Sequence, residues 1–279
     1  MAVAAQAAPP PTTESADAPV IRVEGLQAHY GATQVLHDVD LTVAPGEIMV
    51  IMGGSGSGKS TLLRHLVGLT RPTEGGIELL GLDITRAGAM EMLGLRRRIG
   101  VAFQGGALFS SMSVLENIML PLREHTRLDR KTMEIMARLK LEVVNLAGAD
   151  ALMPAQLSGG MLKRAAVARA IVMDPKLLFF DEPSAGLDPV VSSALDDLIL
   201  KLREAMNMSI VVVTHELESA FKIADRITVL DQGRILMVDD VAGIRRSDNA
   251  RIQNLLNRRS DDSEVDARAY LQRLTGEAS

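Results

Sequence analysis

A glycine-rich turn between an apolar run and a helix-like segment carries the clearest chemistry in this sequence. The apolar run covers residues 48–52, and the helix-like segment begins at Lys59. Glycine tolerates the backbone dihedral angles that turn successive N–H groups inward, and it leaves room for a close ligand. A helix that begins at such a turn adds a partial positive charge. The turn fits the phosphate-loop pattern, whose residues here are Gly53, Gly54, Ser55, Gly56, Ser57, Gly58, Lys59, Ser60 and Thr61.

Two side chains of this turn have chemistry of their own. Lys59 can reach the β- and γ-phosphates of a nucleotide, and the hydroxyl of Ser60 can ligate Mg²⁺. The alternative is a glycine-rich turn without a ligand. The strand pattern before the turn and the helix pattern after it are the context that a phosphate loop requires, so we expect nucleotide binding.

A pair of acidic residues follows a second apolar run. Residues 177–180 are Leu-Leu-Phe-Phe, and Asp181 and Glu182 come next. This pattern predicts a buried strand that delivers the acids to its carboxyl end, where ligands bind in open α/β sheets. We expect Asp181 to hold the magnesium shell and Glu182 to accept a proton from an attacking water.

Three single side chains are weaker candidates. Gln104 follows an apolar run and could meet both metal and water, although most glutamines in loops are merely solvated. His215 follows the apolar run 210–213 and could contact a γ-phosphate, although a lone histidine is more commonly an ordinary surface residue. Tyr30 lies in an early loop by its pattern, and it could stack on an adenine base or be an ordinary half-buried tyrosine.

A second glycine-containing turn, residues 157–161, leads into another helix-like segment. Ser158, Gly159 and Gly160 at a helix start would suit a second phosphate cradle. The alternative is a simple N-cap by Ser158, and both roles can hold together. A third turn ends at Asp188, and the proline after it is well placed to open the next helix.

Composition limits the classes of function. The net charge is −5, which gives no electrostatic reason to expect nucleic acid as a partner. The absence of cysteine excludes disulfides, thiolate zinc sites and a thiol nucleophile, and it fits a reducing cytosol. No apolar run approaches the roughly 18 residues that a membrane span needs. Any role at a membrane must therefore come through a partner.

The chain divides into a leader, a main domain and a tail. Residues 1–19 lack the basic start and apolar centre of a signal peptide, and we expect a disordered leader. Short alternating runs at residues 20–23 and 39–43 suggest strands at the start of a domain that covers residues 20–245. Residues 226–239 look like a hairpin whose two strands are joined by Gln232-Gly233.

Strand-like runs stop at about residue 105, and the next 55 residues differ in character. Residues 132–146 carry apolar side chains at the spacing of an amphipathic helix. We therefore expect a helical subdomain at about residues 105–160.

The motifs, in this order along the chain, resemble those of ABC-transporter ATPase domains. The resemblance covers roughly residues 20–240. It implies an α/β fold of the P-loop NTPase class, with an antiparallel β part and the inserted helical subdomain. It also implies ATP and Mg²⁺ as cofactors and a head-to-tail homodimer with two ATP molecules at its interface.

The same resemblance implies a role for each candidate. Within one subunit, Tyr30 would stack on adenine, Ser60 and Gln104 would meet magnesium, Glu182 would be the general base and His215 would sense the γ-phosphate. Across the interface, the Ser158–Gly160 turn would contact the ATP of the opposite subunit, and Asp188 would link the two subunits.

One departure narrows the family. The usual signature after the two glycines ends in glutamine, and here Met161 takes that place. With residues 103–109 and 121–126, this variant resembles the ATPases of Mla-type (MCE-associated) phospholipid transporters of Gram-negative bacteria. That resemblance implies an inner-membrane permease dimer, an MCE-domain protein, a small STAS-domain subunit and a place on the cytoplasmic face of the inner membrane.

Two other functions stay open at this point. One is an importer ATPase for another small solute. The other is a non-transport ABC ATPase, although the single motif set and the lack of sustained heptads argue against it.

Residues 246–279 form the expected C-terminal helical extension. A short apolar stripe at residues 252–256 comes first. Ser263 and Asp266 then have the spacing of a helix start, and Ala267, Tyr270, Leu271 and Leu274 would lie on one face of the helix. Such a short helix needs a surface to pack on, which could be its own subunit, the neighbouring ATPase or a small partner.

Overall fold

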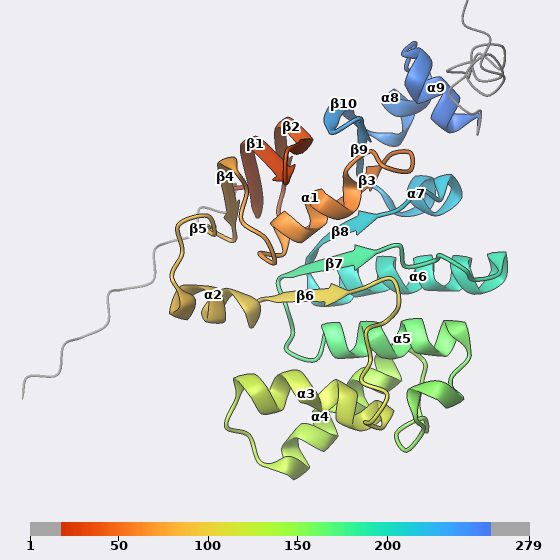
Figure 1. Ribbon diagram of the computed structural model, residues 1–279. Helices are drawn as coiled ribbons and strands as arrows, with labels where there is room; N and C mark the ends of the chain where they lie inside the picture. Colours follow the sequence, from red (N-terminus) through yellow and green to blue (C-terminus); the bar gives the residue numbers. More distant parts are fainter. Residues whose placement is uncertain (1–17, 258–279) are drawn as a thin grey trace, which may run out of the picture.

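The computed structural model describes residues 18–257, which form two sheets and the helices around them (Figure 1). The expectations for the leader before residue 18 and for the helix after residue 260 lie outside the described residues. The helices are α1 (Lys59–Leu66), α2 (Ala89–Arg96), α3 (Val114–His125), α4 (Arg130–Val143), α5 (Gly159–Ala170), α6 (Pro189–Met206), α7 (Leu217–Ile223), α8 (Val241–Arg246) and α9 (Ala250–Leu256), with one 3₁₀ turn, η1 (Pro154–Gln156).

The first sheet is antiparallel and has the strand order β2-β1-β4-β5. Its strands are β1 (Ile21–Tyr30), β2 (Thr33–Val43), β4 (Glu74–Leu79) and β5 (Leu82–Asp83). In β1 the buried Ile21 and Val23 alternate with exposed neighbours, as a strand with one covered face requires. The two expected early strands are therefore present and longer than predicted. The loop placement of Tyr30 is wrong, because this residue ends β1 just before the turn to β2.

The second sheet has the strand order β10-β9-β3-β8-β7-β6. Its strands are β3 (Ile48–Met52), β6 (Ile99–Ala102), β7 (Leu177–Asp181), β8 (Ser209–Val213), β9 (Arg226–Asp231) and β10 (Arg234–Asp239). All neighbours are parallel except β9 and β10, which form the expected hairpin.

The parallel sheet lies between two hydrophobic cores. Alternate residues of β3 belong to different clusters, with Val50 in the core toward α3–α7 and Ile51 in the core toward α1 and the first sheet. This alternation explains why β3 and β8 are apolar at almost every position, since both of their faces are covered.

The expected helical region contains α3, α4 and η1, and α4 confirms the predicted amphipathic helix. Both helices pack on α5, on the side of the molecule away from the first sheet (Figure 1). Within residues 18–257, no helix is both long and apolar enough to cross a membrane.

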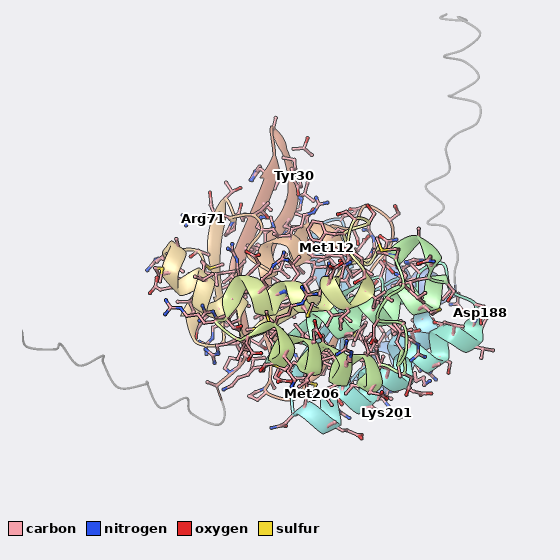
Figure 2. The ribbon with its side chains drawn as sticks, turned by 90° about the horizontal axis from the view of Figure 1, so that it is seen from below. Tyr30, Arg71, Met112, Asp188, Lys201 and Met206 are labelled. Carbon is pink, nitrogen blue, oxygen red and sulfur yellow. The ribbon has the colours of Figure 1, made fainter. Side chains whose placement is uncertain are left out.

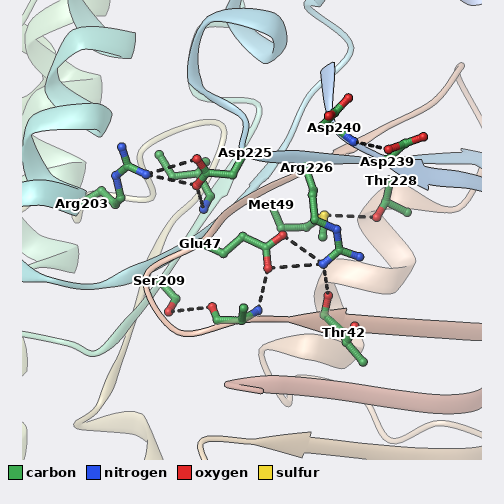
Figure 3. Close-up of polar contacts among 12 residues, drawn as sticks. Thr42, Glu47, Met49, Arg203, Ser209, Asp225, Arg226, Thr228, Asp239 and Asp240 are labelled. Atoms are coloured by element: carbon green, nitrogen blue, oxygen red, sulfur yellow. Dashed lines mark hydrogen bonds and ion pairs between the residues drawn. The ribbon is translucent and has the colours of Figure 1, made fainter. Parts of the chain in front are cut away.

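A polar network fixes the amino end of the parallel sheet (Figure 3). The guanidinium of Arg226 donates to both carboxylate oxygens of Glu47, at 3.2 and 3.5 Å, and to the carbonyl of Thr42 at 3.4 Å. Asp225 accepts a hydrogen bond from the amide of Ile48 at 2.8 Å. These contacts join β2, β3 and β9 at the edge opposite to the phosphate loop.

Candidate functional site

Four adjacent parallel strands deliver the candidate residues to one edge of the sheet. The strands β3, β8, β7 and β6 are neighbours in this order, so their carboxyl ends meet at the same edge. The phosphate loop follows β3, His215 follows β8, Glu182 follows β7 and Gln104 follows β6. Residues that are up to 162 positions apart, from Gly53 to His215, are thus gathered at one place.

The glycines of the phosphate loop have different reasons to be glycine. A Cβ on Gly53 would lie 2.1 Å from the carbonyl oxygen of Leu230 in β9, so the loop packs too closely there for any side chain. Gly58 has φ 104° at the start of α1, a value that disfavours other residues. Gly54 has nothing within 4 Å of its Cβ position, and the loop is open to a ligand on that side.

The polar side chains of the loop are arranged for an anion. Lys59 donates to the carbonyls of Gly53 and Gly54, at 2.8 and 2.9 Å. Burial lowers the pKa of the Lys59 amine, and the carboxylates of Glu182 and Asp181 partly oppose this shift. The buried hydroxyl of Ser57 has no hydrogen-bond partner in the structure. Ser55 and Ser60 are exposed, and Thr61 is buried at the first turn of α1.

The turn of the β9–β10 hairpin supports the loop from behind. The amide of Gly233 donates to the carbonyl of Ser57 at 2.9 Å, and its own carbonyl accepts from the amide of His37 at 2.8 Å. A Cβ on Gly233 would lie 2.1 Å from the carbonyl oxygen of Val35. The hairpin turn is therefore wedged between β2 and the phosphate loop.

Glu182 is the most constrained acidic residue at the edge. Its φ is 47°, in the left-handed region that non-glycine residues rarely adopt. Its Oε2 accepts from Nδ1 of His215 at 2.9 Å, from the amide of His215 at 3.4 Å and from the hydroxyl of Thr214 at 3.2 Å. The side chain is 12% exposed, so this carboxylate is held in one orientation with limited access to water.

Asp181 precedes Glu182 and is the last residue of β7. Burial raises the pKa of its carboxyl, and the nearby charge of Glu182 raises it further, while Arg64, Lys163 and Lys59 oppose the shift. A cation at this place would stabilise the ionised carboxylate.

Gln104 and Tyr30 lie at the margins of the edge. The side chain of Gln104 is exposed, and its backbone carbonyl is bound by Lys163. Tyr30 is 47% exposed, and its hydroxyl accepts from Arg64 at 3.3 Å. This hydrogen bond is the main cause that lowers the pKa of Tyr30. The phenol ring is therefore tied to α1 and open on its outer side.

The Ser158 turn and Asp188 lie elsewhere. Ser158 is the N-cap of α5, with its hydroxyl accepting from the amide of Met161 at 3.3 Å, as the capping alternative predicts. Asp188 caps α6 by accepting from the amides of Val190 and Val191, at 3.1 and 3.0 Å. The two helix starts pack on each other, because a Cβ on Gly160 would lie 2.7 Å from Val191.

Neither helix start reaches the phosphate loop of its own subunit. Figure 1 shows the start of α5 on the far side of α6 from the β3–α1 connection, and Figure 2 shows Tyr30 and Asp188 well apart. Val190 beside Asp188 is 79% exposed. The structure thus brings one group of predicted residues together and leaves Ser158, Gly159, Gly160 and Asp188 at a separate place. There Ser158, Gly159 and Asp188 are exposed and Gly160 is half-buried.

Sequence reasoning missed three residues that hold this edge. Lys163 binds two backbone carbonyls, Thr214 donates to Glu182, and Arg64 donates to Tyr30. Thr214 is the first residue after the buried strand β8 and His215 is the second, so the position of Thr214 could have marked it as a site residue. For Lys163 and Arg64 the sequence offers none, because each contact depends on distant parts of the chain.

Comparisons with known proteins agree with this architecture. Residues 36–185 match the family model described as ABC transporter. The chain is 39% identical over 242 residues to the intermembrane phospholipid transport system ATP-binding protein MlaF of Haemophilus influenzae. This match covers 87% of this chain and 92% of the relative. It is 38% identical over 239 residues to a probable ribonucleotide transport ATP-binding protein, mkl, of Mycobacterium tuberculosis. This match covers 86% of this chain and 67% of the relative.

Solved structures share the fold. The dimeric structure of the ATP-binding cassette MJ0796 in a post-hydrolysis state, bound to ADP and Pi, is 31% identical with a TM-score of 0.74. The match covers 79% of this chain and 98% of that one. The structure of cbiO1 from Clostridium perfringens, part of the ABC transporter complex cbiONQ, has a TM-score of 0.75 at 26% identity. The match covers 91% of this chain and 99% of that one. With these similarities and the edge described above, the chain belongs to the ABC transporter family as an ATP-binding subunit.

Proposed function

We propose that this chain binds and hydrolyses ATP to power an inner-membrane transporter that moves phospholipids between the inner and outer membranes. The observation that carries the hydrolytic part is the meeting of the phosphate loop with Glu182 and His215 at one edge of the parallel sheet. The phospholipid part is supported by the similarity to MlaF, which extends over 87% of the chain.

The phosphate loop would bind the nucleotide by exchanging internal contacts for phosphate contacts. The amine of Lys59 now binds two neutral carbonyls, and a phosphate oxygen would give it a stronger hydrogen bond because the acceptor is then charged as well as the donor. The open side of Gly54 leaves the backbone amides accessible to the phosphates. The exposed ring of Tyr30 would stack on the adenine base.

Glu182 would act as the general base. Thr214 and His215 bind one oxygen of its carboxylate, which leaves the other oxygen to accept the proton of an attacking water. Because the carboxylate accepts from Nδ1 of His215, that nitrogen carries the proton in this contact. The Nε2 atom lies across the imidazole ring from Nδ1, and it would contact the γ-phosphate.

Mg²⁺ would bind jointly with the nucleotide. Its protein ligands would be the hydroxyl of Ser60, the side-chain oxygen of Gln104 and the carboxylate of Asp181. Over residues 18–257 no cluster of three or more acidic, histidine or cysteine side chains suits a metal ion by itself. One carboxylate with neutral oxygens fits Mg²⁺, which commonly takes its remaining ligands from substrate phosphates and water. The ion supplies charge neutralisation at the phosphates.

A second copy of the chain would complete each ATP site. Ser158, Gly159 and Asp188 are exposed and Gly160 is half-buried. The start of α5 lies away from the phosphate loop of its own subunit. In a head-to-tail homodimer, the positive start of α5 would face the ATP bound by the partner. This arrangement is supported by the dimeric cassette to which the chain is 31% identical.

The remaining partners follow from the proposed transport. The chain would lie on the cytoplasmic face of the inner membrane, held there by a permease dimer. An MCE-domain protein and a small STAS-domain subunit would complete the complex. No nucleic acid is part of the proposal.

Mixed dimers test the composite site. Lys59→Ala removes the loop amine, and Ser158→Arg blocks the remote turn. Each variant alone should lose ATP binding at both interfaces, whereas a mixed dimer retains one interface with both elements intact. We expect proven mixed dimers to bind about one ATP per dimer. An absence of binding in the mixed dimer would contradict the shared site.

The central experiment uses Glu182→Gln in the purified transporter complex. The amide oxygen of glutamine can still accept from Thr214 and His215, so only the proton acceptor is lost. We expect the rate constant kcat to fall at least about 100-fold, as general bases contribute about 10²–10⁴, with ATP affinity within about twofold of the parent. Steady-state hydrolysis near the parent value would contradict the assignment of the base.

A second candidate is transport of another small solute. It is favoured by the mycobacterial relative, which is named for ribonucleotide transport. Lipid and solute analysis of the complex purified from membranes separates the two, because a phospholipid transporter should carry bound phospholipid and should hydrolyse ATP faster in vesicles that contain it. Stimulation by ribonucleotides with no response to phospholipid would favour the second candidate.

A further inference from the structure

The side chain of Lys163 is buried and connects three parts of the chain. It lies in the first two turns of α5, just after the Ser158–Gly160 turn, and it is 8% exposed. Its ammonium group donates to the backbone carbonyl of Gln104 at 2.5 Å and to that of Glu182 at 3.0 Å. In the part of the chain that the structure describes, these two carbonyls are its hydrogen-bond partners.

Both carbonyls belong to the ends of neighbouring strands. Gln104 is the second residue after β6, and Glu182 is the first residue after β7. The ammonium therefore bridges the two backbones just where each one leaves the sheet. Both residues also belong to the proposed catalytic edge, through their side chains.

The contact with Glu182 falls on a conformation that needs support. The left-handed φ of 47° is unfavourable for glutamate, and it persists only where the surroundings fix it. The amide of Glu182 donates to the carbonyl of Val213 at 2.8 Å, which fixes one side of the residue. The carbonyl side is fixed by Lys163 and by the amide of Ala185, at 3.0 and 3.3 Å.

A second cation from the same helix strengthens the connection. Arg169 of α5 donates to the carbonyls of Gly106 and Ala107, at 2.9 and 2.7 Å. The turn after Gln104 is thus held to α5 at both of its ends. Burial lowers the pKa of the Lys163 amine, and the carboxylates of Asp181 and Glu182 partly oppose this shift. The two carboxylates near it help to keep the ammonium charged in a site that disfavours charge.

We propose that Lys163 is a positioning residue that ties the start of α5 to Gln104 and Glu182 of the same subunit. This inference rests on the proposed function. A displacement of the Ser158–Gly160 turn, which would face the ATP of the partner, then moves the carbonyls on which the orientation of Glu182 depends. The lysine thus links the ATP site of the partner, which the Ser158–Gly160 turn would face, to the orientation of Glu182 in the ATP site of its own subunit. It does so without touching nucleotide itself.

The test compares four forms of the assembled transporter: parent, Lys163→Met, Lys163→Gln and Lys201→Met. Methionine keeps an unbranched stem and removes the donors. Glutamine keeps two N–H donors without the charge. Lys201 is an exposed lysine in the second half of α6, so its substitution is a matched control for loss of one lysine.

We expect Lys163→Met to lower kcat for ATP hydrolysis at least tenfold, with the dissociation constant for ATP within twofold of the parent. We expect Lys163→Gln to recover kcat to within threefold of the parent, because its amide can still donate to the carbonyls. Lys201→Met should match the parent in both measurements. A Lys163→Met variant with kcat within twofold of the parent would overturn the proposal, as would an equal loss in the methionine and glutamine variants.

Two further comparisons keep the test decisive. Should Lys163→Met fail to fold, Lys163→Asn replaces it, since asparagine has the same donors as glutamine and a shorter reach. Equal kcat values for the asparagine and glutamine variants would then overturn the proposal, and a tenfold lower value for asparagine would support it. A parent complex that does not hydrolyse ATP contradicts the proposed function itself, whereas normal hydrolysis in parent and Lys163→Met contradicts only the role of Lys163.

Discussion

The ion pair between Arg226 and Glu47 allows a quantitative test of how the amino end of the parallel sheet is held. Arg226→Met keeps the apolar stem and removes the guanidinium group that Figure 3 shows between Glu47 and Thr42. The side chain of Glu47 is 7% exposed, so its carboxylate cannot simply turn to water. The amide of Ala44, at 2.6 Å, remains as a donor to it.

The expected loss lies between two known limits. Breaking a fully buried ion pair costs about 3–5 kcal/mol, and an exposed pair contributes about 0–1 kcal/mol. Arg226 is 39% exposed and Glu47 keeps one donor, so we expect the free energy of unfolding to fall by about 2 kcal/mol. For a chain of this length, that loss lowers the melting temperature by about 4–8 °C.

The assay is thermal and urea denaturation of parent and variants under identical conditions. Arg22→Met is the matched control, because Arg22 and Glu24 are 3.9 Å apart with side chains 47% and 72% exposed. That control should lose less than about 0.5 kcal/mol. Adding Glu47→Gln to Arg226→Met should recover about 1 kcal/mol, since no unpaired buried charge remains. A loss for Arg226→Met no larger than for Arg22→Met, or no recovery in the double variant, would refute the reasoning.

Two other predictions concern the loop and the interior. Gly53→Ala should lower both thermal stability and ATP affinity, because its Cβ would lie 2.1 Å from the carbonyl of Leu230, and a forced shift of this kind costs about 1–3 kcal/mol. Gly54→Ala, with nothing within 4 Å of its Cβ position, is the control in the same melting and titration experiments, and equal effects of the two substitutions would contradict the close-packing argument. Asp196→Asn should change the pH dependence of stability, because burial raises the pKa of the Asp196 carboxyl above its ordinary value of 3.8, with the hydrogen bond from Ser219 opposing. The folded chain then holds this proton more tightly than the unfolded chain, so the stability of the parent falls as pH rises from 3.8 through the folded pKa. The asparagine variant should gain stability relative to the parent over that interval, in melts between pH 4 and 7. A gain in stability that does not depend on pH would count against the buried charge.

Local patterns were sufficient to predict much of the sheet. The apolar run of β7 and the Gln232-Gly233 turn needed no knowledge of the rest of the chain. Both turn residues have positive φ, 45° and 74°, as a two-residue hairpin turn of this kind requires. The order of the motifs was also enough to predict the α/β fold and to identify the candidate residues that follow the strand ends.

The missed features depend on tertiary contacts. Helix α2 buries only Leu95, so it has no apolar stripe that a periodicity argument could find. Tyr30 looked like a loop residue because its neighbour is glycine, yet β1 continues to it through pairing with Thr33 in β2. Lys163 contacts carbonyls 59 and 19 residues away, and no spacing rule along a helix predicts such partners.

The wedge at Gly233 has a consequence for amide hydrogen exchange. Its N–H is bound to the carbonyl of Ser57 in the phosphate loop, while its own carbonyl is bound to the amide of His37 in β2. The N–H can exchange with solvent only after the hairpin turn and the loop separate, and that separation strains the contact with the first sheet. ATP binding would stabilise the phosphate loop against this separation, so it should slow exchange at Gly233 about as much as at the loop itself. Gly233 lies 176 residues beyond Ser57 in the sequence. In exchange experiments this amide would behave as part of the nucleotide site, although no nucleotide atom need touch it.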